Sequence, residues 1–143
     1  MAESPRVRGL DHIAIVVADV DASHDFYVGV LGMEQVARPA FDFGGAWFRA
    51  GETLVHAIAP HDRSGPVGIN EADAGVEAPS AGATSPTKTS RWTHIAFDVD
   101  DVEAFLPTIR AADVPILDGP KRRPDGVTQL FVLDPDGHII ELS

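Results

Sequence analysis

The spacing of apolar positions changes from strand-like to helical in the first part of the chain. The stretch from His12 to Val17 is rich in Ile and Val and alternates sides as a strand does, and helical spacing follows from about Val20 to Leu31. Asp19 stands where a helix N-cap belongs, and Gly32 stands where a C′ residue ends a helix. The pattern predicts a strand followed by a helix.

The same succession returns later in the chain. A short strand-like stretch begins at His94, and helical spacing runs from Val102 to about Ala112 with Asp101 in the N-cap position. Pro107 falls within this second helix, which predicts either a kink or a late start.

These two stretches are an internal repeat. Residues 12–20 and 94–102 lie 82 positions apart and are identical at six of nine positions. A match of this quality between two segments that both open as strands indicates a duplicated structural unit.

Each predicted helix is followed by three short strand-like pieces. They cover about 34–38, 46–50 and 53–58 in the first half and 115–117, 128–133 and 138–142 in the second. Pro, Gly, Ser and Thr crowd the region between the halves, which is typical of a surface linker. We therefore expect one α+β domain over residues 1–143, built from two tandem βαβββ modules (about 8–59 and 91–143) joined by a linker (about 60–90).

Composition excludes several classes of function. The 143 residues contain no Cys, so a disulfide framework, a Cys-held metal and a thiol nucleophile are all ruled out. A net charge of −11 disfavours nucleic acid and anionic membranes as partners. The sequence has no long apolar run and no secretory leader pattern, so the expected location is the cytoplasm.

Strand alternation places four polar residues at matching points of the two halves. His12 and His94 open the two units, and His56 and Glu141 lie in the last strand of each. A carboxylate within the apolar stretch Ile139–Leu142 is costly unless it is balanced, and a divalent cation held by imidazoles and a carboxylate would balance it. Zinc, nickel, manganese and iron all suit such donors.

The whole chain resembles the glyoxalase / bleomycin-resistance / dioxygenase superfamily, whose members are also called vicinal oxygen chelate proteins. The resemblance covers about Leu10 to Leu142 except for the linker. It is carried by the segments Leu10–Ala14, Phe26–Met33, Trp92–Phe97 and Leu133–Leu142.

This resemblance implies curved mixed sheets around a metal cleft, with the helices outside. It also implies one divalent metal per site, held by His12, His56, His94 and Glu141, and a homodimer in which modules of two chains complete each site. Glyoxalase I enzymes have a Glu where this chain has His56, so His56 is expected to be either a fourth ligand or a general base.

The sequence thus predicts a metal-dependent, glyoxalase-like lyase, isomerase or epimerase, with Glu141 and His56 as catalytic residues. The substrate would be a small molecule that chelates the metal through oxygens. Alternatives are an extradiol ring-cleaving dioxygenase, an antibiotic-resistance transferase, and a non-catalytic binding protein of the bleomycin type. An aromatic content of 7% counts against the stacking groove of that last class.

Four further residues are candidates for binding the substrate. Arg122 and Arg123, on the loop before a strand of the second half, suit an anionic tail, although two solvated charges would explain them equally well. Trp47 and Arg49 are expected to line the cleft.

Overall fold

The computed structural model describes residues 4–60 and 94–143. The predicted linker, and Trp92 with it, lies almost entirely outside the described residues.

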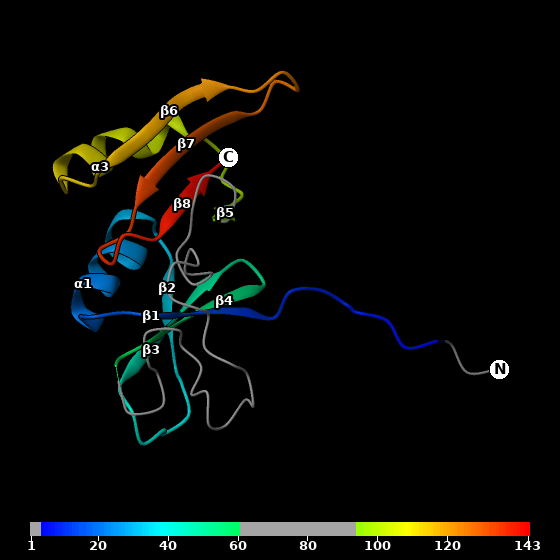
Figure 1. The fold of residues 1–143 in the computed structure, drawn as a ribbon, viewed down its shortest axis with the longest axis vertical. Helices are drawn as coiled ribbons and strands as arrows, with labels where there is room; N and C mark the ends of the chain where they lie inside the picture. The colour runs from blue at the N-terminus through cyan, green and yellow to red at the C-terminus, as the bar shows by residue number, and fades with distance from the viewer. Residues whose placement is uncertain (1–3, 61–93) are drawn as a thin grey trace, which may run out of the picture.

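Two four-stranded mixed sheets with identical topology form the framework (Figure 1). Sheet A has the order β1-β4-β3-β2 and sheet B the order β5-β8-β7-β6, and the first and last strand of each unit pair in parallel. The strands are β1 His12–Val16, β2 Glu34–Val36, β3 Gly45–Ala50, β4 Thr53–Ile58, β5 Ile95–Phe97, β6 Ile116–Arg122, β7 Thr128–Leu133 and β8 Ile139–Leu142. The predicted fold class, α+β with tandem βαβββ modules, is confirmed.

The first helical segment begins and ends where the sequence predicts but changes its winding midway. It consists of α1 (Val20–His24) and the π-helical η1 (Asp25–Val30). The Asp19 side chain accepts from the backbone N–H groups of residues 21 and 22, as an N-cap does. Gly32 has a φ of 75°, which a residue without Cβ adopts at little cost, and it ends the segment.

The second helical segment has the late start that Pro107 predicts. It opens as the 3-10 turn η2 (Glu103–Phe105) and continues as α3 (Leu106–Ala111), so the proline falls in the first turn of the α-helix. Asp101 accepts hydrogen bonds from the backbone N–H groups of residues 103 and 104.

Most predicted strands match, and the largest difference is in β6. The predicted piece 115–117 extends to Arg122, because β6 pairs with β7 through two register irregularities that the sequence pattern does not reveal. The piece predicted over 34–38 ends at Val36.

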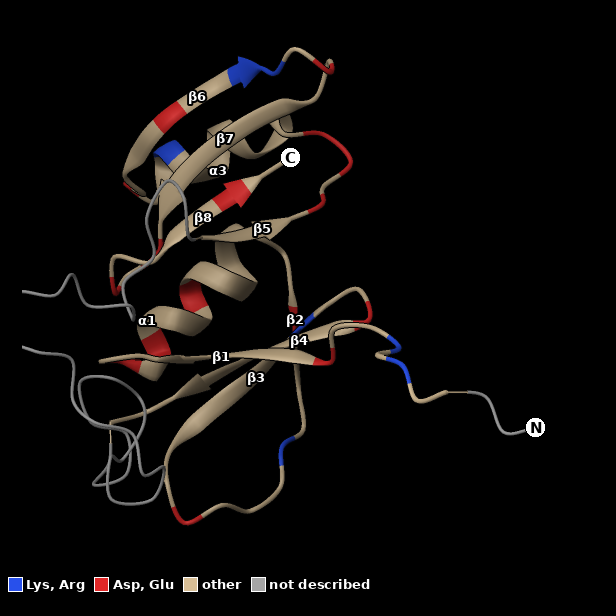
Figure 2. Ribbon diagram, turned by 45° about the vertical axis from the view of Figure 1, so that its right-hand side comes forward, with Lys and Arg blue, Asp and Glu red and all other residues tan. Residues whose placement is uncertain are grey.

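One apolar core joins the two modules. In both views the helical segment α1 lies between the sheets (Figures 1 and 2). The core side chains come from the inner faces of both sheets and from the helical segments, among them Val17, Phe26, Val55, Ile109, Leu130 and Ile140. Each sheet therefore turns one face to this core and leaves its other face outside it.

A buried hydrogen-bond network also connects the modules. The Tyr27 hydroxyl of η1 donates to the Asp134 carboxylate in the turn after β7 at 2.7 Å, and both side chains are buried. In the same turn Asp136 accepts from the backbone N–H of Ala18 in the first module at 2.8 Å. The network fixes the β7–β8 turn against the end of β1.

Among residues 4–60 and 94–143, no helix has the length and apolar character needed to cross a membrane.

Tyr27 makes the contact between the modules sensitive to alkaline pH. Burial, together with the nearby Asp134 carboxylate, raises the Tyr27 pKa far above its ordinary value of 10.0. The unfolded chain loses this proton near its ordinary pKa while the folded chain keeps it, so stability is fully present below about pH 10 and falls as the pH rises further. Tyr27 is the only tyrosine, so tyrosinate absorbance reports this one group.

We expect tyrosinate absorbance to appear only together with unfolding, as followed by circular dichroism in an alkaline titration. Tyr27→Phe should lower the free energy of unfolding at neutral pH by about 1–2 kcal/mol, because Asp134 loses a buried donor. The same substitution should also remove the part of the stability loss above about pH 10 that is due to Tyr27. Ionisation of Tyr27 in a folded protein near pH 10 would contradict this account.

Candidate functional site

The predicted site residues of the first module lie on the face of sheet A opposite the core. His12 opens β1 and His56 lies in β4, on the faces opposite the buried Ile15 and Val55. The Asp11 carboxylate accepts a hydrogen bond from Nδ1 of His12 at 2.6 Å. Such a bond fixes the ring and directs its Nε2 outward, as the partner of a metal-binding imidazole does.

His56 is enclosed between two other rings. His12 stacks on one face and Trp47 on the other, each with its ring centre 4.0 Å away, and both pairs are within 11° of parallel. The Nε2 atom of His56 is buried without a hydrogen-bond partner among the described residues. Burial lowers the pKa of His56, and neighbouring His12 lowers it further.

The predicted site residues of the second module form a hydrogen-bonded cluster on sheet B. His94 Nε2 lies 2.7 Å from Glu141 Oε2, and the Gln129 amide donates to Glu141 Oε1 at 2.6 Å. Glu141 is only 5% exposed although it carries a charge. Both carboxylate oxygens thus have a partner, as a buried carboxylate requires.

Gln129 is a site residue that the sequence analysis missed. It lies in β7, two residues from Phe131, which pairs directly with Glu141 in β8. A diagonal contact of this kind depends on the register of β7 against β8. With the register known, the polar side chain of Gln129 on the same face as Glu141 would have indicated the contact.

The four predicted ligands do not meet within one chain. The described residues contain no group of three or more His, Asp or Glu side chains arranged to hold a metal ion. His12 lies beside His56, and His94 lies beside Glu141, but the two pairs belong to different sheets on faces turned away from the common core.

The donor chemistry of these residues suits a divalent metal, but the ring geometry separates His56 from the others. A metal lies close to the plane of each imidazole that binds it, about 2.0–2.1 Å from the nitrogen. The planes of His12 and His56 are nearly parallel and stacked, so they share no such point. The side chains of His12, His94 and Glu141 are of the kinds that bind a divalent metal, although the described residues do not bring the three together. His12 and His56 cannot bind one ion between their stacked rings.

The predicted substrate-binding residues are dispersed. Trp47 lies against His56, while Arg49 lines a groove of about 480 Å³ between the modules together with Met33 and Phe97. None of the four predicted ligands lines that groove.

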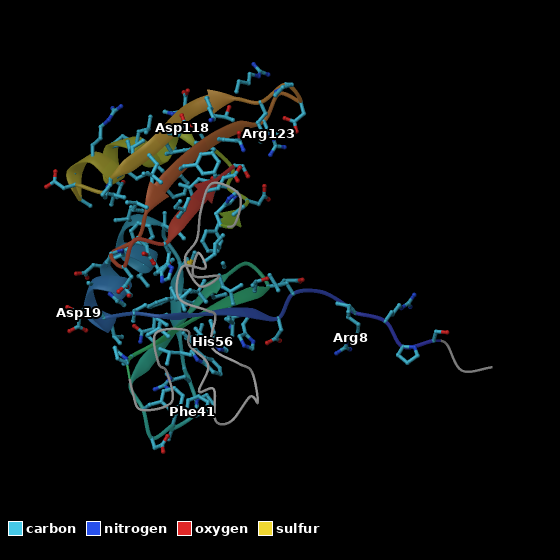
Figure 3. All side chains as sticks on the ribbon, viewed as in Figure 1. Arg8, Asp19, Phe41, His56, Asp118 and Arg123 are labelled. Atoms are coloured by element: carbon cyan, nitrogen blue, oxygen red, sulfur yellow. The ribbon has the colours of Figure 1, made fainter. Side chains whose placement is uncertain are left out.

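Arg122 and Arg123 lie at the β6–β7 hairpin, where Figure 2 shows basic positions in a largely acidic chain. Arg122 is the last residue of β6 rather than a loop residue, because β6 is longer than predicted. Arg123 is paired with Asp125, which lowers the pKa of that carboxyl to about 2. Figure 3 shows Arg123 on the sheet B side of the molecule, away from His56 on sheet A.

A model of the Glyoxalase/Bleomycin resistance protein/Dioxygenase superfamily matches residues 9–142. The chain belongs to this superfamily. The glyoxalase-type match covers both modules and the linker, in agreement with the duplicated topology.

Relatives with several different names resemble this superfamily member. A protein of Vibrio cholerae serotype O1 named "Probable lactoylglutathione lyase" is 29% identical over 135 residues, which are 92% of this chain and 86% of that protein. The solved structure of a Bacillus anthracis protein assigned to the glyoxalase family has a TM-score of 0.69 and is 23% identical. The match covers 98% of this chain and 97% of that protein. The fosfomycin resistance protein FosX of Listeria monocytogenes has a TM-score of 0.68 at 16% identity, with 96% and 91% covered.

The contact between Gln129 and Glu141 can be measured by a double-mutant cycle. We expect Gln129→Leu alone to destabilise the protein, because it leaves a buried carboxylate oxygen without its donor. In a Glu141→Ala background, which has no acceptor at this position, the same change should cost less, with a coupling free energy on the order of 1–3 kcal/mol in urea unfolding. Additive effects of the two substitutions would contradict the contact.

Proposed function

We propose that this glyoxalase-superfamily protein is a metal-dependent enzyme of the lyase, isomerase or epimerase type. Its substrate would be a small molecule with neighbouring oxygens. The observation that carries the proposal is the buried Glu141 carboxylate with His94 and Gln129 around it. A buried carboxylate on the outer face of a sheet is costly unless it is paired, which favours a functional role for Glu141 over a role in packing.

The residues proposed to hold the metal are His12, His94 and Glu141. Nδ1 of His12 is hydrogen-bonded to Asp11, which leaves Nε2 of His12 for the metal. The Gln129 amide donates to one oxygen of Glu141, and the other oxygen lies beside His94. A divalent ion bound there would act as a Lewis acid toward negative charge developing on a substrate oxygen.

We further propose that two copies of the chain complete each site. One chain holds His12 on sheet A and the pair His94–Glu141 on sheet B, on faces directed away from the shared core. In a twofold dimer, sheet A of one copy can face sheet B of the other, so that both sites form at once. Apolar side chains on the same faces, Leu54 and Ile58 on sheet A and Ile139 on sheet B, suit such burial.

His56 is proposed as the group that accepts a substrate proton. Its Nε2 has no partner among the described residues, and the flanking rings hold the imidazole in one plane beside His12. A positioned base must lie within hydrogen-bond reach of the proton that it abstracts. Trp47, which covers the other face of His56, would contact the substrate next to it.

The type of reaction is inferred from the relatives and from the charges near the site. The Vibrio cholerae relative carries the name of a lyase, which supports proton-transfer chemistry on an oxygen-bearing substrate. Arg122, the last residue of β6, is a candidate for an anionic tail although it donates to the Gly126 carbonyl, whereas Arg123 already pairs with Asp125. Arg49 faces the groove between the modules and is a weaker candidate.

Metal content tests the proposed site directly. We expect the protein, after reconstitution with zinc, nickel, manganese or iron, to retain about one ion per chain, as other divalent sites with His and carboxylate ligands do. Glu141→Ala and His12→Ala should each abolish retention, whereas the control Glu34→Ala, an exposed carboxylate on β2, should not. Full retention in Glu141→Ala would place the site elsewhere.

Complementation tests whether the site is shared. A heterodimer of one His12→Ala chain and one Glu141→Ala chain has one site with both lesions and one site with neither. We therefore expect it to hold about half the metal of the wild-type dimer, although each homodimeric variant holds none. If each site lay within one chain, every site would carry a lesion and the heterodimer would bind no metal.

Activity then distinguishes the reaction types. The loaded enzyme should turn over a hemithioacetal or an epimerisable acyl thioester, and His56→Gln should lower kcat by about 10²–10⁴-fold with metal content unchanged. Turnover of a catechol with iron alone, or of an epoxide antibiotic alone, would replace the proposed reaction type by ring cleavage or by group transfer.

A further inference from the structure

Five rings form a row across the outer side of the first module. His12, His56 and Trp47 stand side by side on sheet A, and the row continues through Phe41 and Phe43 in the loop between β2 and β3. In Figure 3 the labelled Phe41 and His56 lie on this same module. The row joins the proposed base to a surface loop.

The row has one break, between Trp47 and Phe41. The other three neighbouring pairs lie within 17° of parallel, with ring centres 4.0–5.1 Å apart. Trp47 and Phe41 are 6.2 Å apart and inclined by 48°. A ring inserted between two others needs their centres to be twice the carbon contact distance apart, about 7–8 Å. A shift of Phe41 away from Trp47 by roughly 1–2 Å would therefore make room for one more ring.

Phe41 is a partly exposed loop residue, and the cation of Arg38 lies beside its ring. Phe41 is 44% exposed on an irregular loop, whereas Phe48 on the core face of β3 is fully buried. The Arg38 guanidinium lies 4.9 Å from the centre of the Phe41 ring. Arg38 donates to the Phe43 carbonyl, but its Nε has no partner among the described residues.

We propose that the gap between Trp47 and Phe41 binds a planar aromatic ring that carries a carboxylate, with Arg38 as the partner of the anion. Arginine suits this role because its planar fork pairs with carboxylates and also stacks on rings. The inference rests on the proposed function, since it names the substrate class: an aromatic acid whose ring is held against Trp47, on the side of Trp47 away from His56. The ring site itself needs no metal.

Trp47 fluorescence measures this binding without catalysis. The chain has two tryptophans, so a Trp92→Phe background leaves Trp47 as the only reporter. The ligands are 2-naphthoate, the uncharged 2-naphthamide, and the saturated decalin carboxylate. We expect saturable quenching by naphthoate, at least about tenfold weaker binding of the amide, and no measurable binding of the saturated acid.

Two substitutions separate the ring from the charge. Phe41→Leu should weaken naphthoate and naphthamide alike by about tenfold, because both lose a stacking partner. Arg38→Met should weaken naphthoate alone by a similar factor. Arg110→Met, an exposed arginine of α3 in the other module, is the matched control and should leave both affinities unchanged.

The outcomes keep this inference apart from the proposed function. Naphthoate binding to metal-free Glu141→Ala protein supports the ring site, whereas a metal-loaded wild-type protein without saturable quenching overturns it and leaves the proposed function standing. Equal affinity for naphthoate and its saturated counterpart also overturns it. A Phe41→Leu variant with altered oligomeric state and unchanged naphthoate affinity would make the row of rings a contact between copies, and would overturn it as well.

Discussion

The shared core decides where chemistry can occur in this protein. Both sheets turn their apolar faces toward the helical segments between them, and strand alternation then sends His12, His56, His94 and Glu141 to the opposite faces. The faces that carry these side chains point away from a common centre, and the described part of one chain brings no three of them together as metal ligands. Burying the apolar residues and separating the polar ones are two consequences of the same arrangement.

The two modules have the same topology but stabilise different polar groups at corresponding positions. The second module buries a charge, and the cost is offset by Gln129 and His94, which give each oxygen of Glu141 a partner. The first module has a neutral ring, His56, at the position that corresponds to Glu141, and it is held by stacking rather than by hydrogen bonds. Duplication therefore preserved the positions of the candidate site residues while their physical surroundings diverged.

The sequence predicted what depends on local pattern. Strand alternation, the caps at Asp19 and Gly32 and the late start of the helix at Pro107 follow from neighbours a few positions apart. Gln129 was missed because its contact with Glu141 depends on strand register. The row of rings was missed because an aromatic content of 7% is an average over the chain and does not show that five rings from three strands and a loop lie in one row.

The stacking of His56 gives a physical reason for an imidazole at this position. A glutamate here, as in the glyoxalase I enzymes that the sequence resembles, would add a second carboxylate to the proposed ligands. A carboxylate has no extended face to fill the space between His12 and Trp47, whereas an imidazole fills it and remains able to accept a proton at its edge. The ring plane is then fixed by its neighbours rather than by a metal. Under the proposed function, a residue held in this way would form part of the wall that a substrate contacts, and recognition of a flat substrate and abstraction of its proton would take place on the same sheet.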